Sequence, residues 1–202
     1  MWGHWHPCGY RGERMKIRCA DAVIIRPGNN CHDNTETHKT RWFKKIWSDL
    51  RYQHFILSPE TVIVDPFARN CEIARPNTND LNPDAVAINN LCASEYLQSL
   101  RYDFADLLIF DPPFSERMAK DNYDGFGINL YSSDSKLMTR CLKDCGRVIK
   151  PGGYLLKFGF NINQPAKCFE LVGLWLIEKT GHRNTTIVGL WKNNQGSIYE
   201  WF

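Results

Sequence analysis

An apolar run followed by an acid, two prolines and an aromatic ring occupies residues 106–115, DLLIFDPPFS. Proline locks φ at about −65° and has no N–H to donate, so Pro112 and Pro113 would end a strand in a stiff corner. That corner would present two fixed acceptors, the Asp111 carboxylate and the Pro112 carbonyl, beside the ring of Phe114. Two such acceptors can position a planar aromatic amine and draw its hydrogens out of the ring plane, which frees the nitrogen lone pair for attack. An ordinary proline-rich turn is the structural alternative.

Two more acids follow short apolar runs. Asp65 stands in VIVDPFARNC (62–71), and Asp80 lies within NTNDLNPD (77–84). Ligands of open α/β sheets bind beyond the carboxyl ends of the strands, so Asp65, Asp80 and Asp111 are expected at one edge. A carboxylate at the end of the second strand commonly accepts ribose hydroxyls, but Asp80 could equally cap a turn.

The elements that must position these residues can be read from hydrophobic spacing. Apolar residues recur at three- and four-residue intervals in 37–52, which predicts a helix with one buried face. A second helix is expected in 132–153, capped by Ser133 or Asp134 and ended by KPGG. This helix lies between strand-like runs, which indicates parallel β–α–β construction, and the TGHRN turn predicts a closing antiparallel hairpin. The short apolar runs occupy 21–25, 61–65, 86–92, 106–111, 153–160, 171–178 and 185–192.

Five pieces of the sequence, in order, resemble class I S-adenosylmethionine-dependent amino-methyltransferases. They are VIVDPFARN (cofactor strand), NDLNP (ribose-binding turn), DPPF (catalytic signature), IKPGGYLLKFGF (strand after the catalytic helix) and HRNTTIVGLWK (closing hairpin). The resemblance covers roughly 61–192 and is nearest to small, often phage-borne, N6-adenine DNA methyltransferases. It implies an α/β fold with a Rossmann-like sheet, mostly parallel with a C-terminal antiparallel hairpin. We expect one domain over 1–202, with a basic N-terminal lid or helical region (1–52) before the Rossmann-like core (61–192).

The same resemblance implies S-adenosyl-L-methionine as cofactor and a role for individual residues. Asp65 would lie near the methionine amine and Phe67 beside the sulfonium. Asp80 would accept the ribose hydroxyls, Leu81 would cover the adenine, and Phe114 would stack on an extruded base. The implied catalytic residues are Asp111, Pro112, Pro113 and Phe114; the cofactor residues are Asp65, Pro66, Phe67, Ala68, Asp80, Leu81, Ser94 and Asp111; the substrate residues are Phe114, Ser115, Arg117, Tyr123 and Phe126.

Three features depart from the family pattern. Arg69 and Asn70 stand where the family loop carries glycines, which let a backbone approach its ligand, and Arg adopts left-handed dihedrals poorly. The interval from Asp65 to Asp80 is too short for a full crossover helix, so we expect a trimmed fold whose pocket is partly closed by the N-terminal lid. Ser94 stands where the family often carries an acid.

Target contacts are expected from two regions, because the chain leaves no room for a separate recognition domain. The first is basic: ten Lys and Arg against five Asp and Glu precede residue 53. A basic surface suits a polyanion, here DNA, with RNA as the alternative. The second is the aromatic loop 115–135, which could order over an extruded base. A solvated surface and an unstructured loop are the plain alternatives.

Composition argues against some classes of protein. No apolar run approaches the roughly 20 residues of a membrane helix and no signal-peptide pattern is present, so we expect a cytoplasmic protein (host cytoplasm if phage-encoded) without a membrane partner. The eight cysteines should then be free thiols, with Cys141 and Cys145 in the core. No metal site is expected, since the candidate ligands lack regular zinc spacing. Those candidates are His4, His6, Cys8, Cys19, Cys31 and His32.

The favoured function is methylation of the N6 amine of adenine in DNA, as a phage-encoded modification. Two alternatives stay open. One is guanine-N2 methylation of ribosomal RNA, because enzymes of that kind also carry DPPF. The other is a cofactor-dead nucleic-acid-binding or anti-restriction protein, suggested by Arg69 and Asn70 at glycine positions.

Overall fold

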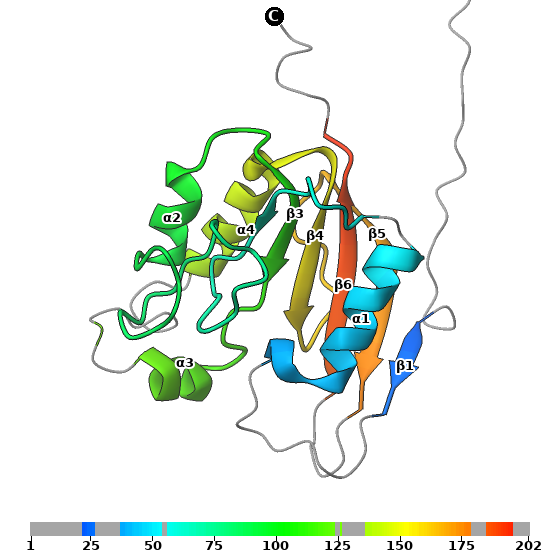
Figure 1. The fold of residues 1–202 in the computed structure, drawn as a ribbon, viewed down its shortest axis with the longest axis horizontal. Helices are drawn as coiled ribbons and strands as arrows, with labels where there is room; N and C mark the ends of the chain where they lie inside the picture. The colour runs from blue at the N-terminus through cyan, green and yellow to red at the C-terminus, as the bar shows by residue number, and fades with distance from the viewer. Residues whose placement is uncertain are drawn as a thin grey trace, which may run out of the picture.

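The structure is a computed structural model that describes residues 22–26, 37–53, 56–123, 126, 136–178 and 185–195. One six-stranded sheet runs through the molecule in the order β1-β5-β6-β4-β3-β2 (Figure 1). The strands are β1 (Val23–Ile25), β2 (Ile63–Val64), β3 (Ala105–Phe110), β4 (Ile149–Gly159), β5 (Phe169–Ile177) and β6 (Thr186–Asn193). The helices are the 3-10 helix η2 (Thr37–Lys39), α1 (Arg41–Tyr52), α2 (Ala93–Ser99), α3 (Glu116–Tyr123) and α4 (Leu137–Val148).

Strand directions confirm the expected fold class. β2, β3 and β4 run parallel, and β1 runs parallel to β5. β6 lies antiparallel to both of its neighbours, β4 and β5. The β3–α4–β4 connection is therefore the expected parallel β–α–β unit, and β5 with β6 forms the expected terminal hairpin. None of the helices in the described ranges is long and apolar enough to cross a membrane.

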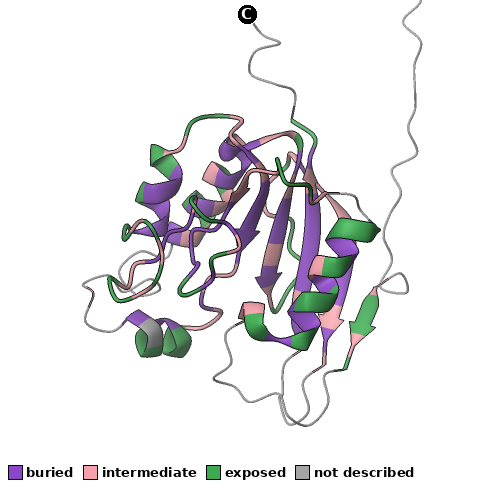
Figure 2. Cartoon of the chain, in the orientation of Figure 1, coloured by how far each residue is buried: buried purple, intermediate pink, exposed green. Residues whose placement is uncertain are grey.

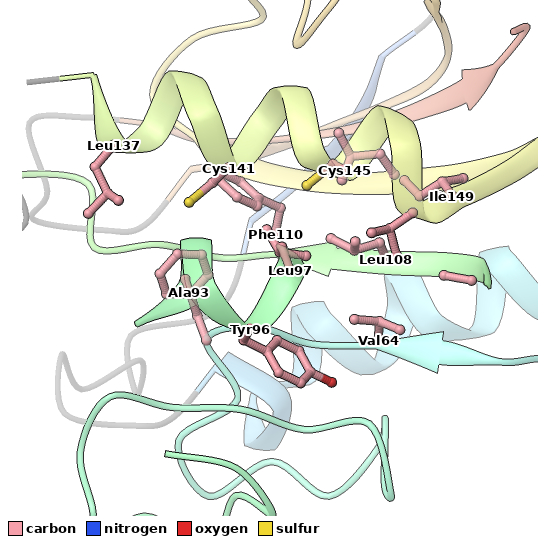
Figure 3. Close-up of a cluster of buried hydrophobic side chains, with 14 of the residues drawn as sticks. Val64, Ala93, Tyr96, Leu97, Leu108, Phe110, Leu137, Cys141, Cys145 and Ile149 are labelled. Carbon is pink, nitrogen blue, oxygen red and sulfur yellow. The ribbon is translucent and has the colours of Figure 1, made fainter. Parts of the chain in front are cut away.

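Alternation of side chains along β3 divides the core into two layers. Leu108 and Phe110 face α2 and α4, while Leu107 and Ile109 face α1 on the other side of the sheet. Figure 2 shows the resulting burial of the strands and of the inward helix faces. The α2–α4 layer appears in Figure 3 and includes the buried thiols of α4, as expected. The described cysteines are all free: Cys71, Cys92, Cys141, Cys145 and Cys168.

Helix α1 is fixed to the sheet by polar contacts as well as by its apolar face. The Thr40 hydroxyl accepts a hydrogen bond from the Phe43 N–H at 3.2 Å, which caps the first turn. The buried Asp49 carboxylate accepts a hydrogen bond from the Trp175 indole of β5 at 3.0 Å and pairs with Lys45. The helix expected in 37–52 is thus confirmed as η2 followed by α1. Its buried apolar residues are Trp42, Phe43, Ile46 and Leu50.

The sheet is trimmed beyond β2, as expected from the short interval between Asp65 and Asp80. No helix forms between them, and two single bridges, Asp65 with Thr78 and Asn79 with Asn89, replace further strands. The expected strand at 86–92 is therefore wrong: this segment crosses the edge as a loop with Val86, Ile88 and Leu91 exposed.

The side chain of Asn79 substitutes for the missing ladder. This fully buried amide donates to the carbonyls of Pro66 and Leu91, at 3.1 and 3.0 Å, and its oxygen accepts from the Leu91 N–H at 3.0 Å. A side-chain amide can serve both a donor and an acceptor of a neighbouring chain, as a strand would. Asn79 therefore ties the loop after β2 to the loop before α2.

Two expectations concern the helices α3 and α4, which follow β3 in the sequence. Helix α4 begins at Leu137 with Lys136 as its N-cap residue, and the expected caps Ser133 and Asp134 lie outside the described residues. The stretch 115–135 is not a continuous loop, because α3 forms within it. Ser115 caps α3 by accepting the Met118 N–H at 3.2 Å.

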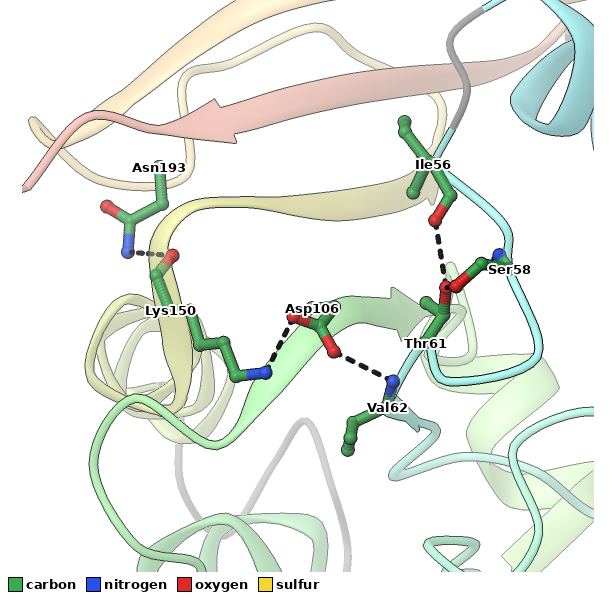
Figure 4. Close-up of polar contacts among 7 residues, drawn as sticks. All are labelled: Ile56, Ser58, Thr61, Val62, Asp106, Lys150 and Asn193. Atoms are coloured by element: carbon green, nitrogen blue, oxygen red, sulfur yellow. Dashed lines mark hydrogen bonds and ion pairs between the residues drawn. The ribbon is translucent and has the colours of Figure 1, made fainter.

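The amino-terminal end of β3 is held by a separate polar network (Figure 4). The Asp106 carboxylate accepts the Val62 N–H at 2.8 Å and the Lys150 ammonium at 2.7 Å. The Asn193 amide donates to the Lys150 carbonyl at 3.5 Å. These contacts lock β3, β4 and β6 in register at the end of the sheet opposite to Asp111.

Candidate functional site

A cavity of about 180 Å³ opens at the carboxyl ends of β2 and β3. It brings together the segment after β2 and the proline corner after β3, which lie over 40 positions apart in the sequence. The expected residues that line it are Asp65, Phe67, Ala68, Asp111, Pro112, Pro113, Phe114 and Tyr123. Its walls also include Thr37, His38, Trp42, Phe43, Arg69, Cys71, Ile109, Met118, Phe158 and Thr186. The start of the N-terminal helical region therefore forms part of the cavity wall, and its role as a lid stays a prediction.

The proline corner directly continues the most buried strand. Asp111 and Pro112 are half-buried and Pro113 is buried, so the corner is part of the cavity wall and not a solvated turn. The Phe114 ring packs against the α1 layer and meets the Phe160 ring edge-on, with centroids 5.1 Å apart. Phe114 therefore has a fixed position beside the two acceptors.

Asp65 forms the floor of the cavity and is only 4 % exposed. One carboxylate oxygen accepts the Phe67 N–H at 3.0 Å. Burial raises the pKa of Asp65 to about 8, the Phe67 N–H opposes this, and the negative charges of Asp111 and Asp80 raise it further. The carboxyl groups of Asp65 and Asp111 thus both line this small cavity, which favours a positively charged ligand, while Asp80 acts on Asp65 from outside the lining.

The loop after β2 keeps a left-handed residue even without glycine. Arg69 adopts φ of 49°, a region that costs a non-glycine residue of the order of 1–3 kcal/mol. In this conformation the Arg69 N–H points at Asp80 and donates to its Oδ2 at 3.0 Å. The tight turn therefore forms with Arg69 at the position where glycine was expected, and Arg69 is one of the residues that line the cavity.

Asp80 is fully buried, and both of its oxygens accept hydrogen bonds from the protein. Oδ1 accepts the Asn82 N–H at 2.9 Å, and Oδ2 accepts the Arg69 N–H and the Tyr123 hydroxyl, the latter at 3.2 Å. Burial raises the pKa of Asp80, and these donors lower it. Tyr123, expected on the target side, thus contacts the carboxylate expected to bind ribose. A hydroxyl is the same kind of donor that a ribose would offer.

Several expected site residues do not line the cavity. Pro66 and Asp80 are buried and Leu81 is half-buried, but none of the three is part of the lining. Ser94 is buried in the first turn of α2, where its hydroxyl accepts from Gln98 at 3.3 Å. Arg117 points to solvent near Asp121 on α3. Ser115 caps α3, and Phe126 packs against the α2–α4 layer. All of these positions stay predictions as far as function is concerned.

Sequence reasoning did not assign the walls contributed by distant elements. Phe158 and Thr186 reach the cavity from β4 and β6, and His38 reaches it from η2. For Phe158, the place one residue before the carboxyl end of β4 was an available signal, because neighbouring parallel strands end at the same edge. No local pattern marks Thr186 or His38.

A second cavity, of about 560 Å³, lies at the opposite end of the sheet and is larger than the first. Its charged lining includes Lys150 and Asp106, which neutralise each other. We place the candidate site in the smaller of these two cavities, because it lies at the carboxyl ends of the parallel strands β2 and β3 and is lined by both Asp65 and Asp111.

Among the described residues no group of three or more His, Cys, Asp and Glu side chains could hold a metal ion. The six candidate zinc ligands named from the sequence lie outside the described residues.

Comparison with known proteins establishes the fold. The sheet matches yhhF from Escherichia coli, which carries a provisional methyltransferase assignment, with a TM-score of 0.52 and 9 % identity over 80 % of this chain and 90 % of that chain. It also matches the N-methyltransferase NodS from Bradyrhizobium japonicum WM9, with a TM-score of 0.51 and 12 % identity over 78 % of this chain and 99 % of that chain. No family model and no curated protein matches the sequence significantly. The chain therefore has the Rossmann-like fold of class I methyltransferases, and identities this low carry no information on activity.

Proposed function

We propose that this protein transfers a methyl group from S-adenosylmethionine to the N6 amine of adenine in DNA. One observation carries the proposal: a single cavity joins the acidic end of β2 to the corner formed by Asp111, Pro112, Pro113 and Phe114. A cofactor and an aromatic amine bound to those two walls would lie side by side. Proximity of this kind accounts for much of the rate of a two-substrate reaction.

The cofactor side fits a sulfonium compound in its charge. S-adenosylmethionine supplies a methyl group on a positively charged sulfur and also carries an ammonium group. Asp65 would hold the ammonium, and the Phe67 ring, fixed edge-on against Phe110 at 5.4 Å, would face the sulfonium. Asp80 would accept the ribose hydroxyls, once the Tyr123 hydroxyl yields its place.

The amine side depends on acceptors alone. The Asp111 carboxylate and the Pro112 carbonyl would each accept one hydrogen of the amine and turn its lone pair toward the methyl group. The nitrogen must lose one proton when it gains the methyl, and Asp111 is the ionisable acceptor at that place. Phe114 would stack on the base, with a stabilisation of about 1–3 kcal/mol.

A nucleic-acid substrate is supported by charge near the cavity. Arg41 and Lys44 lie on the exposed side of α1, whose first turn lines the cavity, while the exposed Lys45 pairs with Asp49. Cations in such a place attract a phosphate backbone without reading its sequence. Adenine in DNA is the substrate of the small methyltransferases that the sequence resembles.

The first prediction concerns Asp111. Asp111→Ala should reduce methyl incorporation into DNA by at least about a hundredfold, the usual scale for loss of a positioned acid–base group. S-adenosylmethionine binding, measured by calorimetry, should survive because Asp65 and Asp80 remain. Full methylation by this variant would contradict the assignment.

The matched control is Asp84→Ala, which removes an exposed acid outside the cavity. Wild-type protein is offered DNA and RNA strands in parallel, and the modified base is identified by mass spectrometry after digestion. N2-methylguanine in RNA would favour the ribosomal RNA alternative. Absence of cofactor binding by wild-type protein would favour the binding-protein alternative.

A further inference from the structure

We propose that the segment after β4, Phe160–Asn163, is a second contact for the target strand and holds the nucleotide next to the extruded base. This inference rests on the proposed function and deepens it. It identifies the substrate as a nucleic-acid strand with neighbours on the target base, as opposed to a free base or nucleoside.

The position of Phe160 is the first observation. Its ring meets Phe114 of the amine corner at a centroid distance of 5.1 Å and an interplanar angle of 66°. Phe160 is nevertheless 42 % exposed, and Ile162 is exposed to the same extent. The Phe160 ring is therefore exposed to water immediately beside the corner, and a second large apolar side chain, Ile162, is exposed two positions further on. An exposed aromatic ring in such a place is a stacking surface for a base of any sequence.

A cation beneath the segment is the second observation. Lys157 is the register partner of Phe110, the residue before Asp111. Its ammonium donates to the Asn161 side chain at 3.3 Å and to the Asn163 carbonyl at 3.5 Å. An ammonium has three hydrogens, so one is left for a further acceptor. Burial lowers the pKa of Lys157, and a neighbouring anion would oppose that effect.

The segment is also held in shape by its own polar groups. The Asn161 side chain that accepts from Lys157 accepts the Asn163 N–H as well, at 3.3 Å. Phe160 is thus presented from a fixed turn. A nucleotide offers both a planar ring for Phe160 and a phosphate for Lys157, whereas an apolar peptide would use only the ring.

The test is a double-mutant cycle on binding affinity. It combines the Phe160→Ala variant with a DNA strand in which a nucleotide next to the target adenine is abasic. The probes are a short single DNA strand with one adenine and two copies in which the nucleotide on one or the other side of that adenine is abasic. Binding is followed by fluorescence anisotropy. Wild-type protein should lose about tenfold in affinity for one of the abasic probes. The Phe160→Ala variant should bind the intact strand about tenfold more weakly than the wild-type protein does, and should bind that abasic probe no more weakly than it binds the intact strand.

Additive losses, or unchanged binding by Phe160→Ala, would overturn the inference. Tyr102→Ala is the matched control, because Tyr102 is 50 % exposed and lies at the other end of β3. Lys157→Met should make the dependence of log Kd on log salt shallower by about 0.7, the contribution of one phosphate contact on a single strand. Lys143→Met, on the exposed side of α4, should leave that slope unchanged.

Methyl transfer to the intact strand is measured with the same proteins. If the affinity losses of Phe160→Ala and of the abasic probe are non-additive but no methyl transfer occurs, the proposed function is wrong and the strand contact is supported. If methyl transfer occurs but the affinity losses are additive, only the inference of a strand contact is wrong.

Discussion

Asp65 is a carboxyl group that folding removes almost completely from water. Its neighbours add to the cost, since Asp111 and Asp80 are also acidic and a single backbone N–H opposes them. Stability alone would favour a neutral side chain here. Sites that bind ligands commonly retain such unfavourable groups, because the ligand supplies the missing partner.

This cost should be visible as a pH dependence of stability. Asp65 has a pKa of about 8 in the folded protein against 3.8 ordinarily, so between these values the folded state holds a proton that the unfolded state lacks. Stability must therefore fall as pH rises through that window, by up to about 1.4 kcal/mol per pH unit. The Asp65→Asn variant should lose this slope, so its free energy of unfolding should rise relative to that of the wild type from about pH 5 to about pH 8. Urea unfolding at several pH values measures it.

The control is Asp84→Asn, which changes an exposed acid and should follow the wild-type profile. Parallel profiles for wild type and Asp65→Asn would show that Asp65 is ionised in the folded protein.

The Tyr123–Asp80 hydrogen bond leads to a second residue-level prediction. A buried hydroxyl bonded to a buried carboxylate competes with any ligand hydroxyl for the same oxygen. Tyr123→Phe removes the competitor while keeping the ring, so S-adenosylmethionine should bind more tightly, by about tenfold. Calorimetric titration measures the change, with Tyr102→Phe as a control at an exposed tyrosine. Weaker binding would instead assign the hydroxyl to the orientation of Asp80.

At the scale of the element, helix α1 lines the cavity and is joined to the sheet by a buried hydrogen bond between Asp49 and the Trp175 indole of β5. Asp49→Ala would remove the acceptor of the Trp175 indole and should lower the free energy of unfolding by about 1–3 kcal/mol. Asp49→Asn keeps an acceptor oxygen and should cost less. Chemical denaturation compares the three proteins, and equal stability of all three would contradict this account of how α1 is held.

Helices α1 and α3 both line the cavity, but only α1 could be predicted from a local sequence pattern. Helix α1 has a clear apolar spacing, and its presence was predicted. Among the side chains of α3 whose burial is described, those buried are Ala119 and Tyr123, which is too weak a pattern to predict a helix among the glycines and polar residues around it. The hydrogen bond between Tyr123 of α3 and Asp80 joins positions 43 apart, so no local sequence pattern could predict it.

At the scale of the whole molecule, the sheet was predictable where strands are buried on both faces. Continuous apolar runs and turn residues mark β3 and β4, and their carboxyl ends locate Asp111 correctly. The prediction failed at the thin edge, where 86–92 has the apolar residues of a strand. There the buried Asn79 side chain satisfies the backbone groups that a strand would have paired. A hydrophobic pattern does not reveal such a substitution.

The pairing of β1 with β5 has a consequence for the order of assembly. It is parallel and joins positions 152 apart, as does the Arg26–Glu178 ion pair beside it. Such a pairing closes the longest loop in the sheet for only three residue pairs, so loop-closure entropy disfavours it until β5 and β6 have met. β1 is the first of the described strands to be synthesised but should therefore dock last, so a nascent chain would complete this sheet only after β5 and β6 have been made.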